Sequence, residues 1–363
     1  MQLRSLVAVL SLVLVGQSSN VFAVKPRPTP TPTPPGPTPT PTPAAGACAV
    51  MPCRYQQTRY SNPARTDVLN AQSQWLATFT DNSYSVKVKG TTRTFSEPII
   101  PETSGVTQYT VTTFIWVRLM VNKFTGTVDE NWLDQQLASS SPDVLAMSMQ
   151  YIANAPPIYN GGGLQIAGDS GYGDAAGADF NDYLPVTWSY GSFGGNDAPE
   201  SSELREMDCS GFMRMIFGYR ESLRTPNPAT NTAGGITLAA YANNRPGIAF
   251  PRVSADQCNP SKGVGVYVVP YVSGQKPTSY GNLTTGDLVC FDADSNETGI
   301  DHLGMFLGID SGGHYRFISS RNSLKGPTMN DSGVSQTGPP CYSPSTLDGC
   351  GWAPDGWRSA VRP

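Results

Sequence analysis

Histidine is almost absent from this sequence, and charged residues are sparse. The 363 residues include two histidines, and Asp, Glu, Lys and Arg together make up 14% of the chain, with a formal net charge of −4. Two histidines are too few for a His-rich zinc site, and the cysteines lack Cys-x-x-Cys spacing, so we predict no metal and no other cofactor. The weak negative charge offers no basic surface for nucleic acid or an anionic membrane.

The sequence also lacks an apolar run long enough for a membrane span. The longest run, Leu6–Val15, is much shorter than the roughly 20 residues that a spanning helix needs. It follows Arg4 and precedes the small-residue stretch that ends at Ala23, a pattern typical of a secretory signal. We expect residues 1–23 to be a signal peptide and the protein to be secreted, either extracellular or in the cell wall.

Residues 24–46 are dominated by alternating proline and threonine. Such a segment cannot bury a core and favours the extended polyproline conformation, at about 3.1 Å per residue. We interpret it as a linker, which could be a passive spacer or an arm that carries a catalytic domain through the wall. The residues after it suffice for one large or two ordinary domains.

Seven cysteines in a secreted protein favour disulfides, and the odd number leaves one cysteine over. Short spacing predicts two local bonds and leaves one remaining pair: Cys48–Cys53, Cys341–Cys350, and then Cys258–Cys290. Cys290 could instead be an inert free thiol, because the geometry of the remaining pair cannot be read from the sequence. In either case Cys209 is predicted to be free.

Residues 47–140 form an N-terminal region to which no chemistry can be assigned. Its patterns predict a helix over Thr66–Thr78, strands in Tyr84–Val88 and Tyr109–Val121, and a short helix near Asp129–Leu137. The region could be a wall-binding or regulatory domain, or a structural extension of the enzyme domain. Its fold is left open.

A further helix is expected to begin at Ser141 and to run to about Asn154. Ser141 would be the N-cap and Pro142 the first helical residue. Two prolines then end the helix, and Tyr159–Gly163 follows as a glycine-rich loop.

The sequence around Cys209 predicts a reactive thiol. Asp208 is a favourable N-cap for the apolar segment that follows, which places Cys209 in the first turn of a buried helix. Unpaired amides and the positive end of the helix dipole would stabilise a thiolate there. The competing interpretation is a buried, inert cysteine.

A nucleophilic cysteine needs a neighbouring base, and only two histidines are available. His302 lies inside a predicted strand, where a sheet can hold the imidazole rigidly against a helix start. His314 lies at a predicted hairpin turn, where a solvated surface position is the better interpretation. His302 is therefore the predicted base.

Several motifs in order resemble the NlpC-type cell-wall peptidases, a family of the papain-like superfamily. They are Asp-Cys-Ser-Gly-Phe at 208–212, Gly-Asp-Leu-Val at 286–289, His-Leu-Gly-Met-Phe-Leu-Gly at 302–308 and Tyr-Arg-Phe-Ile-Ser at 315–319. The resemblance covers about residues 141–325 and implies a catalytic domain over 141–363. It implies an α+β, papain-like fold in which the cysteine helix packs on an antiparallel β-sheet, preceded by an N-terminal extension of unknown fold.

The resemblance also implies further site residues. Tyr159 fits the tyrosine of the family's Tyr-x-x-Gly-Gly loop, although Trp188–Gly191 lies closer to the cysteine and is a rival. Tyr159, Asp208 and Ser210 are assigned to oxyanion stabilisation and substrate positioning. Ser319 occupies the position of the residue that orients the histidine.

The choice of Ser319 depends on the register of the predicted hairpin. Pairing symmetric about Ser311 and Gly312 puts His302 opposite Arg321, with Ser319 on the same face one pair away. A slip by one residue would bring Ser320 there instead. Arg321 itself cannot orient the imidazole because it has no acceptor.

The predicted function is hydrolysis of peptidoglycan stem peptides through a Cys-His acyl-enzyme, with D,L-endopeptidase specificity implied by the resemblance. The alternatives are a wall amidase or transferase that uses the same two residues, and a wall-binding module without activity. The predicted partner is the stem peptide, and the protein is expected to be a monomer.

Overall fold

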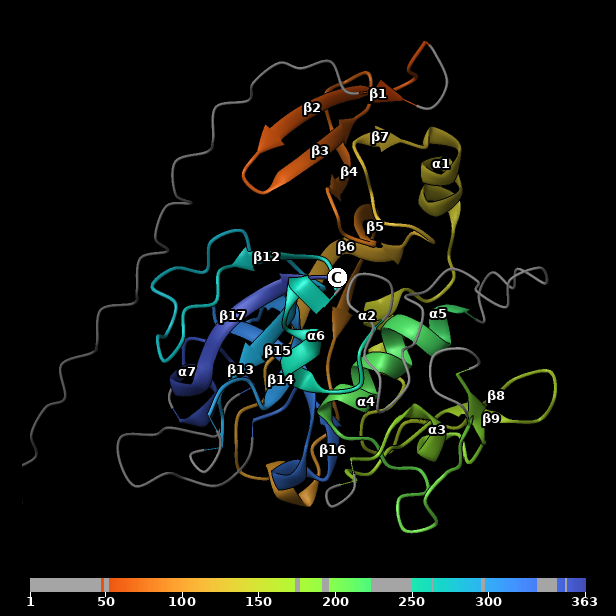
Figure 1. The fold of residues 1–363 in the computed structure, drawn as a ribbon, viewed down its shortest axis with the longest axis vertical. Coiled ribbons are helices and arrows are strands. Elements are labelled where there is room, and N and C mark those ends of the chain that lie inside the picture. Colours follow the sequence, from red (N-terminus) through yellow and green to blue (C-terminus); the bar gives the residue numbers. More distant parts are fainter. Residues whose placement is uncertain are drawn as a thin grey trace, which may run out of the picture. The chain divides into compact units, whose positions relative to one another are not determined.

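The fold is described from a computed structural model of the chain (Figure 1). The described residues are 47–48, 52–173, 177–190, 196–222, 250–262, 264–294, 298–331, 345–349 and 351–363. The chain divides into two units, and all described residues lie in the second, residues 41–363. The predicted signal peptide and residues 24–46 of the predicted linker lie outside the described residues. Within them, no helix has the length and apolar character needed to cross a membrane.

The N-terminal region contains a five-stranded antiparallel sheet whose strands are neighbours in chain order. The strands are β2 (Gln56–Ser61), β3 (Ala64–Leu69), β4 (Trp75–Thr80), β5 (Ser85–Phe95) and β6 (Val111–Leu119). Alternate residues, such as Val86 and Val88 of β5, pack into a core with Phe79 and Phe124. The two predicted period-two segments are thus confirmed as parts of β5 and β6.

The predicted helix over Thr66–Thr78 is wrong, because β3 and β4 occupy this segment. Its buried residues recur every second position, which is the period of a strand. Between the strands, the side-chain oxygen of Asn70 accepts hydrogen bonds from the amides of Gln72 and Gln74, at 3.0 and 2.9 Å. Ser73 has a φ of 58°. This asparagine turn closes a hairpin where we expected helix.

The short helix predicted near Asp129–Leu137 is confirmed as α1 (Glu130–Ala138). Asp129 caps it by accepting from the amides of Asn131 and Trp132. Nearby, β1 (Ala47–Cys48) pairs in parallel with β7 (Thr127–Val128).

A second, six-stranded sheet is antiparallel throughout. In spatial order its strands are β12 (Val266–Val269), β17 (Trp357–Arg362), β13 (Leu288–Phe291), β14 (His302–Ile309), β15 (Tyr315–Arg321) and β16 (Gly326–Thr328). The final strand, β17, enters the sheet between β12 and β13. The region predicted as catalytic therefore depends on its C-terminal residues for a continuous sheet.

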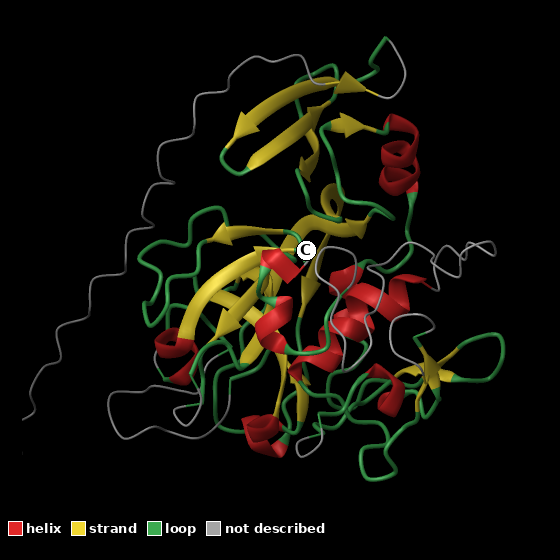
Figure 2. Ribbon diagram, in the orientation of Figure 1, coloured by secondary structure: helices red, strands yellow, loops and turns green. Residues whose placement is uncertain are grey.

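A helical segment begins at Cys209 and packs against this sheet (Figure 2). It consists of α4 (Cys209–Arg214), a π-helical turn η3 (Met215–Tyr219) and α5 (Arg220–Ser222). Phe212, Met213 and Ile216 are fully buried in one core with Leu303 and Met305 of β14. Helix and antiparallel sheet are thus combined as an α+β fold requires, and the buried cysteine helix is confirmed.

The helix predicted over Ser141–Asn154 is shorter and begins later than expected. It is α2 (Val144–Ser148), capped by Asp143, whose side chain accepts from the amide of Ala146 at 3.0 Å. Asp143 also binds Arg93 and the amide of Val117 from the neighbouring sheet. These contacts favour Asp143 as the cap over the predicted Ser141.

The remaining described elements are short. They are η1 (Pro101–Thr103), β8 (Ile158–Tyr159), β9 (Gln165–Ala167), α3 (Phe180–Tyr183), β10 (Trp188–Ser189), β11 (Asn196–Asp197), α6 (Ser254–Gln257), η4 (Pro260–Lys262), η5 (Asn322–Leu324) and α7 (Trp352–Gly356).

Buried charges connect the N-terminal sheet to the second sheet. Asp287 is fully buried and binds Lys87 of β5 at 3.1 Å and Arg362 of β17 at 2.8 Å. Arg362 also donates to the Thr80 hydroxyl at 2.9 Å. In addition, the amide of Ser85 donates to the carbonyl of Pro363 at 2.8 Å. The two sheets thus share a buried polar contact.

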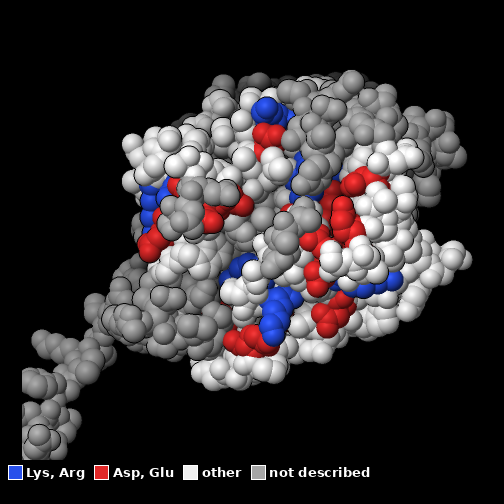
Figure 3. Space-filling view, turned by 60° about the horizontal axis from the view of Figure 1, so that its bottom comes forward, with Lys and Arg blue, Asp and Glu red and all other residues white. Residues whose placement is uncertain are grey.

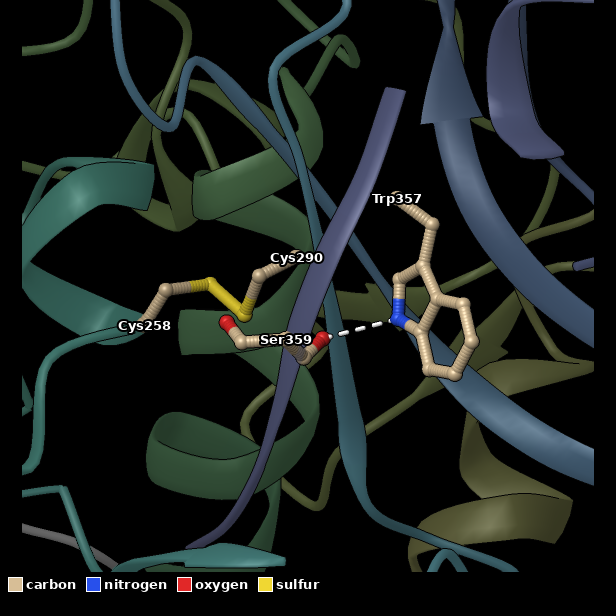
Figure 4. Close-up of a disulfide and its surroundings, with 4 residues drawn as sticks. All are labelled: Cys258, Cys290, Trp357 and Ser359. Carbon is tan, nitrogen blue, oxygen red and sulfur yellow. Dashed lines mark hydrogen bonds between the residues drawn. A yellow bond between two sulfur atoms is a disulfide. The ribbon is translucent and has the colours of Figure 1, made fainter. Parts of the chain in front are cut away.

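The predicted disulfide between Cys258 and Cys290 is confirmed, with 6.0 Å between the Cα atoms (Figure 4). Cys209 is a free cysteine, also as predicted. Cys53 is disulfide-bonded, but its pairing with Cys48 stays a prediction. Cys341 and Cys350 lie outside the described residues.

Candidate active site

Cys209 lies at the first residue of α4, directly after its cap. The Asp208 carboxylate accepts from the amide of Gly211 at 2.6 Å, as predicted for an N-cap. It also accepts from the Ser210 hydroxyl at 2.9 Å. The side chains of Asp208 and Ser210 are therefore joined to each other at the helix start, while Cys209 is left 7% exposed.

The sulfur of Cys209 meets the strand that carries His302. The backbone amides of Leu303 and Ser210 are near enough to the sulfur to lower the pKa of the thiol. Leu303 follows His302 directly, so their Cα atoms are about 3.8 Å apart. The fold thus brings the predicted nucleophile to the beginning of β14, where the predicted base lies.

The imidazole of His302 contacts Ser319. Its Nε2 atom lies 3.3 Å from the Ser319 hydroxyl. Ser320, the alternative under a shifted register, points elsewhere and donates to the carbonyl of Met207 at 2.6 Å. The geometry therefore places Ser319, and not Ser320, beside the imidazole nitrogen.

The register of β14 and β15 explains this arrangement. Met305 pairs with Ile318 and Phe306 with Phe317. Near the turn the pairing is shifted by one residue, with Gly308 opposite Arg316, and an irregularity between Phe306 and Gly308 restores the register symmetric about Ser311 and Gly312. Continued toward the start of β14, that register sets His302 opposite Arg321.

Two aromatic rings lie against His302, which is half-buried. The ring of Trp352 meets it edge-on at 5.2 Å, and the ring of Phe291 lies at 5.9 Å. Burial, and to a lesser extent the nearby cation of Arg321, lower the pKa of His302 to about 3. The imidazole is therefore neutral at physiological pH.

The expectation that the helix start stabilises a thiolate is wrong for the protein without substrate. Burial raises the pKa of Cys209 to about 12, and the negative charge of Asp208 also raises it. The amides of Leu303 and Ser210 and the cation of Arg252 oppose this rise without overcoming it. Dehydration of the sulfur outweighs the helix dipole, so the thiol is protonated at neutral pH.

Arg252 is a residue of the site that the sequence did not reveal. Its guanidinium binds the Asp208 carboxylate at 2.8 Å and donates to the Ser210 hydroxyl at 2.6 Å. It also donates to the carbonyl of Gly177. Arg252 follows a long segment after the helix, so no local pattern connects it to Cys209. In the sequence, Arg252 is marked only as a charged residue that follows an apolar segment in a chain with few charges.

A buried pair of charges supports the helix one turn further along. Arg214 of α4 binds both carboxylate oxygens of Asp179, at 3.0 and 2.9 Å. It also donates to the hydroxyl of Tyr190 at 2.7 Å. Tyr190 belongs to the segment that rivals Tyr159, and in this structure its hydroxyl is occupied by the ion pair.

Tyr159 lies at the end of β8, in a hairpin with β9, and its side chain is 59% exposed. Among the described residues, no hydrogen bond joins its hydroxyl to Cys209. His314 lies at the surface with a side chain 43% exposed, and its Nδ1 atom is 3.2 Å from Asp348. Tyr159 and His314 therefore lie apart from Cys209, whereas His302 begins the strand on which the cysteine helix packs.

Within the described ranges, no cluster of three or more His, Cys, Asp or Glu side chains could hold a metal ion. On the face drawn in Figure 3, Lys and Arg side chains lie in separate small groups among acidic and uncharged ones. The described part of this face therefore offers no continuous basic patch.

The site thus has a free cysteine at the start of a helix that packs against the histidine-bearing strand of an antiparallel sheet. Residues 188–337 match the model of the NlpC/P60 family. The family consists of cell-wall peptidases with a papain-like fold. The matched residues include Cys209, His302 and Ser319 and begin after Tyr159. No curated protein matches the chain.

Proposed function

We propose that this protein is a secreted cysteine hydrolase that cleaves amide bonds in peptidoglycan stem peptides, with Cys209 as nucleophile and His302 as base. The observation that carries the proposal is the proximity of the Cys209 thiol to the amide of Leu303, the residue after His302. The match of residues 188–337 to the family model supports the substrate class. The finer proposal is cleavage of the D,L bond after D-glutamate.

The proposed reaction begins from a neutral thiol and a neutral imidazole. Nε2 of His302 donates to the Ser319 hydroxyl, which leaves Nδ1 to take the thiol proton as the sulfur attacks the scissile carbonyl. The imidazolium then protonates the leaving amine, and water releases the acyl group from sulfur.

Backbone amides at the start of α4 are the proposed oxyanion donors, with Asp208 and Ser210 holding the first turn in place. Tyr159 keeps its proposed role in substrate positioning, although its exposure and the start of the family match favour the segment Trp188–Gly191. Signal-peptide cleavage after Ala23, a spacer role for residues 24–46 and a monomeric protein complete the proposal.

A wall-binding module without activity is the second candidate. The raised pKa of Cys209 and the lowered pKa of His302 favour it, because a buried, protonated thiol is also what an inert core cysteine presents. Under this candidate the protein would bind stem peptides and leave them intact.

Incubation of the purified protein with defined stem peptides separates the candidates. Mass analysis of the fragments should find cleavage on the carboxyl side of D-glutamate. Release of an intact stem from a glycan fragment would identify an amidase, and transfer to an added amine would identify a transferase. Binding without any cleavage would support the inactive module.

A further inference from the structure

Residues 250–258, called the arm below, pass over the start of the cysteine helix. The arm contains α6 and ends at Cys258, which is joined by the disulfide to Cys290 of β13. Figure 4 shows this bond next to Ser359 of β17, the register partner of Cys290. The arm is therefore tied covalently to the middle of the six-stranded sheet.

Gln257, the residue before Cys258, connects the arm to the nucleophile's helix. Its side chain is fully buried, and its amide nitrogen donates to the carbonyl of Ser210 at 3.1 Å. The same nitrogen donates to the carbonyl of Pro251 at 2.9 Å. One side chain thus joins the arm to the residue directly after Cys209.

The other end of the disulfide also leads to the nucleophile. Cys290 pairs in register with Leu303 of β14, the strand on which α4 packs, and the Leu303 amide is near enough to the Cys209 sulfur to lower the pKa of its thiol. Cys258 is therefore next in the chain to Gln257, which binds the first turn of α4. Cys290 lies opposite Leu303, whose amide is near the Cys209 sulfur.

We propose that Gln257 is a positioning residue for Cys209, and that the Cys258–Cys290 disulfide holds it in that position. The inference rests on the proposed hydrolase function. With the disulfide intact, the arm fixes the first turn of α4 against β14, so that the sulfur is presented to the scissile carbonyl from one direction. Without it, the arm and the first turn move together and productive alignment is lost.

Replacement of Gln257 tests the first part. Gln257→Met fills similar space without a donor, and we expect kcat for stem-peptide cleavage to fall by about tenfold or more while KM stays unchanged, because misalignment affects attack and not binding. Ala255→Ser, on the exposed side of α6, is the matched control and should keep wild-type kcat. Wild-type kcat in Gln257→Met would overturn the inference.

Gln257→Glu adds a readout that a purely structural role would not give. The carboxylate faces carbonyl oxygens beside the Arg252–Asp208 pair and cannot donate, whereas the protonated carboxyl can. The kcat of this variant relative to wild type should therefore rise as the pH falls, while the ratio for Gln257→Met stays flat. A flat ratio for both variants would contradict a hydrogen-bonding role. If Gln257→Glu does not fold, Gln257→Met decides alone.

Removal of the disulfide tests the second part. The double variant Cys258→Ser, Cys290→Ser should lose kcat as Gln257→Met does, whereas Cys48→Ser, Cys53→Ser should not. A dithiol reductant should have the same effect on wild type: two electrons and two protons pass to Cys258 and Cys290, and the reductant becomes a cyclic disulfide. Combining Gln257→Met with the loss of the bond should cost no more than either change alone. Fully additive losses would contradict the link.

Hydrogen exchange keeps this inference separate from the proposed function. Exchange at the amides of Ser210 and Gly211 should be faster in Gln257→Met than in wild type or Ala255→Ser, with no substrate present. Unchanged exchange would overturn the inference even if the protein is a hydrolase. Faster exchange in a protein that cleaves no wall peptide would support it while the proposed function fails.

Discussion

At the residue scale, the site consists of two neutral groups whose dehydration has opposite effects on their pKa values. Burial raises the pKa of Cys209 to about 12 and lowers that of His302 to about 3. Both shifts disfavour the ion pair in the protein without substrate. An active hydrolase of this kind would form its thiolate only when a substrate reorganises the site.

Alkylation of Cys209 should therefore be slow at neutral pH. Since the pKa is raised, the thiolate fraction at any pH below about 12 is smaller than that of an ordinary thiol, and the rate should keep rising above pH 9. We expect the rate with iodoacetamide at pH 7 to be at least about tenfold below that of a small free thiol. Rapid labelling at pH 6 to 7 would show that the thiolate exists without substrate.

Asp208 affects this reactivity in two separable ways. Its carboxylate caps α4, which an asparagine can also do, and its charge raises the pKa of Cys209. Asp208→Asn should therefore alkylate faster than wild type at the same pH. It should also have a lower melting temperature, because the buried Arg252 keeps Asp179 but loses the charge of Asp208. Slower alkylation in a folded Asp208→Asn variant would contradict the electrostatic account.

At the scale of elements, the sequence was sufficient for the catalytic strand and helix and insufficient for the N-terminal region. The capped apolar segment after Asp208 and the apolar strands β14 and β15 are strong local patterns. Symmetric pairing about the turn matches the observed register at Met305 and Phe306, but the shift between Phe306 and Gly308 was not predictable from the pattern. The segment Thr66–Thr78 forms two strands and not the predicted helix. It has few apolar residues to indicate a period, and the turn at Asn70 determines its structure.

The residues around the nucleophile were less predictable, because long-range contacts determine them. Arg252 and Gln257 bind the helix start from more than 40 positions away in the chain. No periodicity or spacing encodes that contact. The thiolate expectation failed for a related reason: the helix dipole is local and visible in the sequence, whereas the depth of burial depends on the whole fold.

At the scale of the whole molecule, the N-terminal sheet and the second sheet meet at buried charges. Burial alone would raise the pKa of Asp287, but Arg362 and Lys87 together hold it below its ordinary value. Burial lowers the pKa of Lys87 to about 8. We propose that residues 47–140 are a structural extension of the enzyme domain, because their separation would expose these groups.

Two substitutions at this contact should differ greatly. Asp287→Asn leaves two buried cations without their carboxylate and should lower the free energy of unfolding by about 3–5 kcal/mol. Lys87→Met leaves Asp287 paired with Arg362 and should cost about 1 kcal/mol or less. Urea unfolding of both variants measures the difference. Equal losses would mean that the charges contribute little beyond packing.

Deletion of residues 24–46 should leave kcat and KM on small soluble stem peptides unchanged, because a polyproline spacer supplies reach and no catalytic contact. Activity on intact cell-wall sacculi should fall if reach matters there. A collapse of activity on the small peptide would show that the segment contributes to the catalytic domain.

The proposed function requires Cys209 and His302 to act together in cleaving a wall peptide. The most direct measurement is cleavage of a defined stem peptide by folded Cys209→Ala, His302→Ala and His314→Ala variants, with wild type beside them. We predict loss of cleavage to background in the first two and nearly wild-type cleavage in the third, because His314 lies at the surface with Asp348. Full activity in folded Cys209→Ala or His302→Ala, or loss confined to His314→Ala, would contradict the account.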